Sequence, residues 1–108
     1  MIFVRLYLQD GLIKRIESAG HASASEGVSI PCAGVSLVLR TAGRLINKVP
    51  AAKLDVRANK EGEFFLDVLS PERLSRDWYS GVSSYILQAL EDLVRDFPDQ
   101  IKLSVEEL

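Results

Sequence analysis

Two residues with nucleophilic or acid–base chemistry, His21 and Cys32, each occur once in the chain and lie on either side of a segment rich in Ala, Ser and Gly. Cysteine attacks as the thiolate, and a free thiol with a pKa of about 8.5 supplies only a few per cent of it at neutral pH. An imidazole beside the sulfur can take the thiol proton and later protonate a departing amine. The two residues are therefore a candidate nucleophile and acid–base pair.

The residues after this segment predict a helix that begins beside the cysteine. Pro31 is tolerated in the first turn of a helix, and Ser29 is a plausible cap for it. A helix N-terminus stabilises an anion by about 0.3–1 kcal/mol, or about 2 kcal/mol when partly buried, so it lowers a thiol pKa by only about one unit. The imidazole must supply the rest of the stabilisation that the thiolate needs at neutral pH. Free backbone N–H groups near Ala33 and Gly34 are candidates to stabilise an oxyanion.

Structural roles for the same two residues are the main alternative. Unpaired cysteines are commonly buried as small hydrophobic residues, and a lone histidine near a strand end is commonly a hydrogen-bonded structural residue. One Cys and one His supply two good metal ligands, whereas a structural zinc site needs four. We therefore expect neither a metal nor a cofactor.

A β-hairpin is predicted before the histidine. Apolar and other residues alternate in Ile2–Leu8, as in a strand with one buried face. Asp10 and Gly11 are a strong signal for a tight turn, so Leu12–Ser18 should pair back antiparallel. His21 is then expected just past the end of the second strand.

The helix that begins beside Cys32 is predicted to continue through Ile46 and to end near Asn47, before Pro50. Its apolar residues cover nearly the whole circumference up to Arg40. We therefore expect its first half to be buried on several sides.

The second half of the chain predicts another hairpin, a helix and a last strand. The strand-like segments are Leu54–Arg57 and Glu63–Val68, with Asn59–Gly62 as the turn between them. Apolar residues recur at three- and four-residue steps from about Arg76 to Phe97, as in an amphipathic helix, and Ile101–Val105 alternates as a strand. The order β-β-α-β-β-α-β predicts an α+β fold: a two-layer sandwich in which a largely antiparallel sheet packs against two helices.

Length and composition limit the remaining possibilities. With 108 residues, of which 47% are hydrophobic and 26% charged, residues 1–108 are expected to form a single domain. The 13 basic and 15 acidic residues are scattered and give a net charge of -2, so direct nucleic-acid binding is not expected. No apolar run approaches the roughly 20 residues of a membrane span, and a lone thiol suits a reducing compartment. We therefore expect a cytoplasmic protein without a membrane partner.

A set of small residues around the histidine and the cysteine resembles the signature of the ribosomal-processing cysteine proteases, the Prp or YsxB-like family of small bacterial proteins. The matching residues, in order, are Gly20, His21, Ala22, Gly27, Ile30, Cys32, Ala33, Val35 and Ser36. The opening hairpin, the apolar helix and the late amphipathic helix extend the resemblance over essentially the whole chain.

The resemblance implies a peptidase that removes the N-terminal extension of a large-subunit ribosomal protein, the one numbered twenty-seven. It implies that Cys32 is the nucleophile and His21 its base. It also implies a homodimer, with a ribosomal protein precursor as peptide substrate and a mobile loop, residues 22–30, over the site. Further motif or substrate-loop candidates on this basis are Gly20, Ala22, Gly27, Ser29 and Ser36.

One position departs from the family pattern. Members usually carry Asp three residues before the cysteine, whereas this chain has Ser29. Serine can cap the helix but cannot supply the charge of an acid. The alternative to a protease is therefore a non-catalytic, ribosome-associated or peptide-binding module on the same scaffold.

Overall fold

A computed structural model describes residues 1–22, 29–58 and 60–108 of the chain. Its elements are β1 (Ile2–Gln9), β2 (Leu12–Gly20), α1 (Ile30–Asn47), β3 (Leu54–Arg57), β4 (Glu63–Val68), α2 (Arg76–Asp96) and β5 (Ile101–Glu107). This order confirms the prediction, and a short 3-10 helix at Pro71–Arg73 is the one addition among the described elements. None of the helices in the described ranges is long and apolar enough to cross a membrane.

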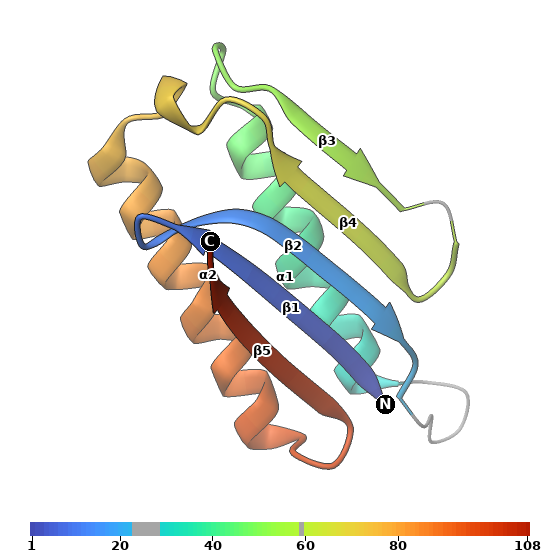
Figure 1. The fold of residues 1–108 in the computed structure, drawn as a ribbon. Helices are drawn as coiled ribbons and strands as arrows, with labels where there is room; N and C mark the ends of the chain where they lie inside the picture. Colours follow the sequence, from blue (N-terminus) through green and yellow to red (C-terminus); the bar gives the residue numbers. More distant parts are fainter. Residues whose placement is uncertain (23–28, 59) are drawn as a thin grey trace.

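The strands form one sheet in the order β3-β4-β2-β1-β5, and both helices cover the same face of it (Figure 1). All neighbouring pairs are antiparallel except β1 and β5, which run parallel because α2 carries the chain back along the sheet before β5. The α+β, two-layer fold with a largely antiparallel sheet is therefore confirmed.

The β1–β2 hairpin closes as the sequence predicts. Asp10 and Gly11 have φ values of 54° and 77°, the positive values that a two-residue hairpin turn needs. The register between the strands shifts after Tyr7, which leaves Lys14 opposite no residue of β1. Such a bulge bends the strand and leaves part of its backbone to find partners outside the sheet.

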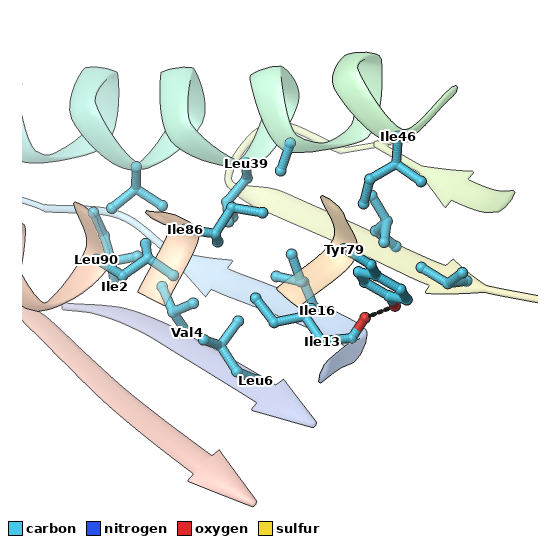
Figure 2. Packing of buried hydrophobic residues seen from close by; sticks show 14 of the residues in the cluster. Ile2, Val4, Leu6, Ile13, Ile16, Leu39, Ile46, Tyr79, Ile86 and Leu90 are labelled. Carbon is cyan, nitrogen blue, oxygen red and sulfur yellow. Dashed lines mark hydrogen bonds between the residues drawn. The ribbon is translucent and has the colours of Figure 1, made fainter. Parts of the chain in front are cut away.

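The backbone of Ile13, next to this bulge, is held by α2. The side-chain oxygen of Ser83 accepts a hydrogen bond from the Ile13 N–H at 3.0 Å. The Tyr79 hydroxyl donates to the Ile13 carbonyl oxygen, drawn as the dashed line in Figure 2. Tyr79 and Ser83 are one helical turn apart and both are buried. These two bonds fix α2 on the sheet at Ile13, beyond the described β2–β4 pairing, which begins at Arg15.

Helix α1 buries one stripe of side chains rather than most of its surface. Leu39 and Ile46 point from α1 into the core shared with the sheet (Figure 2). On the opposite side Ile30 and Leu37 are 65% and 66% exposed. The expectation that the first half of α1 is buried on several sides is therefore wrong for the single chain. Among the described elements, the sheet and α2 are what pack against this helix, and both leave this side of it uncovered.

Candidate active site

Strand β2 ends at a glycine that the fold requires. Gly20 has φ +105°, and a Cβ there would lie 2.1 Å from the carbonyl oxygen of Met1. The strands can approach this closely only without a side chain. His21 follows this glycine, and its carbonyl oxygen accepts a hydrogen bond from the amino group of Met1. The backbone of the histidine is therefore fixed at the end of the sheet.

The cysteine lies in the first turn of α1, as the sequence predicts. Ser29 is the N-cap, with an extended backbone, and its hydroxyl oxygen accepts the Cys32 N–H at 3.3 Å. Pro31 occupies one of the first two helical positions, where its missing N–H costs no helical hydrogen bond. The predicted helix start and cap are confirmed.

These two segments meet at the sulfur of the cysteine. The Ala22 N–H donates to the Cys32 Sγ at 3.2 Å, and Cys32 is half-buried. The Ala22 nitrogen is bonded directly to the carbonyl carbon of His21, at about 1.3 Å, so the sulfur lies beside the histidine backbone. The fold therefore brings together the two residues that carry the predicted chemistry.

The imidazole of His21 is exposed and lies against the β3–β4 turn. A Cβ built on Gly62 would be 2.5 Å from both Cε1 and Nε2 of the ring. In the part of the chain that the structure describes, no hydrogen bond joins the ring to Cys32 or to any other group. The ring therefore lies against Gly62, in the described part of the β3–β4 turn (residues 60–62), without a hydrogen bond to a described residue.

A cleft of about 680 Å³ contains both the thiol and the imidazole. Its walls come from the end of β2, the first turns of α1, the β3–β4 turn and the start of β4. The predicted site residues that line it are Gly20, His21, Ala22, Ser29, Cys32, Ala33 and Ser36. Gly34 is not among the lining residues, and Gly27 lies outside the described residues. Residues 23–28 of the predicted mobile loop also lie outside them.

The sequence interpretation missed the contribution of the β3–β4 turn. Lys60, Glu61, Gly62 and Glu63 line the cleft, as does Arg40 from α1. The available signal was the predicted turn at the glycine, but its place beside the histidine follows from strand pairing over a long sequence separation. The four charged side chains include two of each sign, so the cleft is polar without a strong net charge.

The candidate oxyanion donors need a correction. The Ala33 N–H donates to the Ser29 carbonyl oxygen at 3.1 Å, and Gly34 lies inside a helix that begins at Ile30. Only the N–H groups before the fourth helical residue lack an intrahelical partner, and Ala33 is that fourth residue. The expectation of free donors at these two residues is therefore wrong.

Gly34 instead has a packing role. A Cβ there would lie 2.8 Å from the Leu93 Cδ2, so the glycine allows α1 and α2 to approach closely. Within the described ranges, no group of three or more His, Cys, Asp or Glu residues could hold a metal ion.

Several solved structures are similar to this chain over nearly its whole length. The chain is similar to the essential ribosomal processing protease Prp of Staphylococcus aureus, solved with a covalently linked product peptide: 24% identity, 98% of this chain and 100% of that chain covered, TM-score 0.82. A second structure of that protease, with a substrate peptide, has 22% identity, the same coverage and a TM-score of 0.80. A Streptococcus mutans protein has 17% identity, with 100% and 99% covered and a TM-score of 0.80.

These structural likenesses show a common fold. No curated protein matches the chain in sequence. A family model described as cysteine protease Prp matches residues 1–102, nearly the whole chain. The resemblance seen in the sequence is therefore confirmed, and the chain belongs to the cysteine protease Prp family.

Proposed function

We propose that the protein is a cysteine endopeptidase that removes the N-terminal extension of large-subunit ribosomal protein number twenty-seven, with Cys32 as nucleophile and His21 as base. The observation that carries this proposal is the contact of the Ala22 N–H with the Cys32 sulfur, directly beside the histidine, in one cleft. Family membership supports the reaction class. The Staphylococcus aureus relative is described as a ribosomal processing protease and was solved with bound peptides.

The reaction begins with proton transfer from the Cys32 thiol to the His21 imidazole. The thiolate attacks the scissile carbonyl carbon, and the resulting tetrahedral intermediate expels the amine, which takes the proton from the imidazolium. Water, deprotonated by His21, then hydrolyses the thioester and restores the thiol. Catalytic hydrogen bonds are often long in a free enzyme and tighten with substrate, so the absent ring–sulfur bond is compatible with this mechanism.

The Ala22 N–H has a specific part in this proposal. A donor aimed at the sulfur stabilises the charged thiolate more than the neutral thiol. The N-terminus of α1 acts in the same direction, because Cys32 lies in its first turn. Two backbone features therefore support the nucleophile, and neither depends on an acidic side chain.

The cleft suits a peptide in an extended conformation. Its volume of about 680 Å³ lies in the range of roughly 300–1,000 Å³ usual for ligand pockets, and its lining offers both charged and apolar side chains to a bound segment. Closure of residues 22–30 over the peptide stays a prediction. The homodimer also stays a prediction, and the exposed Ile30 and Leu37 of α1 are side chains that a second copy could cover.

The test is incubation of the purified protein with the extended N-terminus of the ribosomal protein, followed by mass spectrometry. We expect one defined cut that disappears in Cys32→Ala and in His21→Ala. Ser84→Ala, an exposed change on α2, is the matched control and should cleave normally. Circular dichroism checks that each variant is folded.

Retained turnover in either folded variant of the pair would contradict the proposed roles. A chain that binds the peptide without cutting it would favour the non-catalytic module. Since Cys32 is the only cysteine, its alkylation rate can be followed in the intact protein as a function of pH. An activated thiol should react appreciably at a lower pH than a free thiol, in a manner that depends on His21.

A further inference from the structure

The β3–β4 turn brings a glycine against the catalytic candidate His21, in a conformation that other residues rarely adopt. Gly62 has φ +80°. A Cβ at this position would be 2.5 Å from two atoms of the His21 ring and 3.0 Å from the Gly20 carbonyl oxygen. A carbon atom cannot approach this closely without displacing a neighbour, because packed carbon atoms lie about 3.5–4.0 Å apart.

The turn is fixed to the same strand that ends at the histidine. Glu63 pairs with Ala19 of β2, so the next position of the antiparallel ladder brings Gly62 beside Gly20. The Glu63 N–H donates to the Lys60 carbonyl oxygen at 3.1 Å and closes the turn. Gly62 and the His21 backbone are therefore held in one frame. Because the ring is exposed, it would yield to a side chain at Gly62 by moving out of its present place.

We infer that Gly62 is a positioning residue: its missing side chain leaves the seat that places the His21 imidazole in the cleft beside Cys32. The inference rests on the proposed role of His21 as base. Over the residues that the structure describes, no carboxylate or other group hydrogen-bonds to the imidazole, so the contact with the turn sets its place. The β3–β4 turn then helps to position the His21 imidazole in addition to joining two strands.

The size of the effect follows from the geometry. To move from 2.5 Å to an ordinary carbon contact, the ring must shift by about 1 Å when Gly62 becomes Ala. A misplacement of about 1 Å in a catalytic group costs on the order of 100-fold in rate. We therefore expect Gly62→Ala to lower kcat by about 10- to 100-fold, with a smaller change in KM.

The chain supplies a matched control for the backbone. Gly11 has φ +77°, and nothing lies within 4 Å of a Cβ built on it. Gly11→Ala therefore carries a similar backbone strain but displaces no ring. Stability should fall in both variants, whereas turnover should fall only in Gly62→Ala.

A second readout does not depend on catalysis. His21 is the only histidine, so its imidazole resonances can be identified without ambiguity by NMR. They should move in Gly62→Ala and stay in place in Gly11→Ala. Unchanged resonances together with turnover equal to that of Gly11→Ala would overturn the inference.

Failure of the inference and failure of the proposed function are separable. Cleavage that survives in His21→Ala would contradict the role of His21 as base. The NMR comparison would still show whether Gly62 determines the position of the imidazole. Where Gly62→Ala does not fold, the double variant His21→Ala/Gly62→Ala decides, because it removes the ring that collides with the new methyl group. Recovery of the fold supports the seat, and continued unfolding counts against it.

Discussion

Replacing Ser29 with alanine is expected to weaken the start of α1, where the nucleophile candidate lies. The substitution removes the hydroxyl oxygen that accepts the Cys32 N–H at 3.3 Å. Loss of a serine N-cap costs about 0.5–2 kcal/mol. The bond is long and Ser29 is only half-buried, so we expect the lower half of that range, about 0.5–1 kcal/mol. This lowers the folding equilibrium constant by about two- to fivefold.

The same position allows a change in the opposite direction. Ser29→Asp keeps an oxygen acceptor and adds a negative charge at a helix whose first turn has no acidic residue. An anion at a helix N-terminus contributes about 0.3–1 kcal/mol, and salt screens this contribution. At low salt, the free energy of unfolding should therefore be highest with Asp at position 29, lower with Ser and lowest with Ala. The advantage of Asp should shrink as salt is added.

Urea denaturation followed by circular dichroism measures this order directly. Ser36→Ala is the matched control, because the Ser36 hydroxyl bonds only to the exposed Arg40 side chain in the described residues and its loss should cost little. Equal stability of Ser29→Ala and the unsubstituted protein would refute the capping argument. A loss in Ser29→Asp as large as that in Ser29→Ala would refute the charge argument.

Two further predictions concern the bonds that hold α2 on the sheet. Tyr79→Phe and Ser83→Ala each leave a buried backbone group of Ile13 unpaired, so each should lower the free energy of unfolding by about 1–3 kcal/mol. Both side chains bind the backbone of Ile13, so the loss of unfolding free energy in the double variant, measured by urea denaturation, should differ from the sum of the two single losses. Strict additivity would contradict this shared role. Burial, with a smaller contribution from the Asp67 charge, raises the pKa of Tyr79 above its ordinary value of 10.0. The folded state therefore holds the Tyr79 hydroxyl proton more tightly than the unfolded state does. The contribution of this proton to the free energy of unfolding is complete below about pH 10 and decreases as the pH rises further. The loss should be absent in Tyr79→Phe, and an equal alkaline loss in both proteins would show that this tyrosine is not the cause.

The fold could be predicted where the signal is local. Asp10 and Gly11 fix the first hairpin, and the bounds of β3 and β4 agree with the predicted strands. The parallel pairing of β1 with β5 has no local signal, because it depends on how α2 returns across the sheet. Likewise, the backbone of Ile13, next to the bulge at Lys14, bonds to residues of α2 far along the chain.

The same distinction applies to the site. His21 and Cys32 could be predicted because each has distinctive chemistry and a flanking signal for a strand end or a helix start. The exposure of Ile30 and Leu37 could not be predicted, since periodicity shows which residues are apolar but not how many elements will cover them. Gly62 could be predicted as a turn residue, but its contact with the histidine depends on the β2–β4 register.

Shape and charge act at different places in this site. Ser29 is a neutral cap at a helix whose first turn has no acidic residue, and no hydrogen bond joins the imidazole of His21 to a carboxylate among the described residues. We propose that Gly62 orients the ring, whereas the Ala22 N–H and the start of α1 act on the Cys32 sulfur. A change at Ser29 should therefore act through helix stability and the thiol, and a change at Gly62 through the ring. A site that relied on one acid for both tasks would not allow the two effects to be separated.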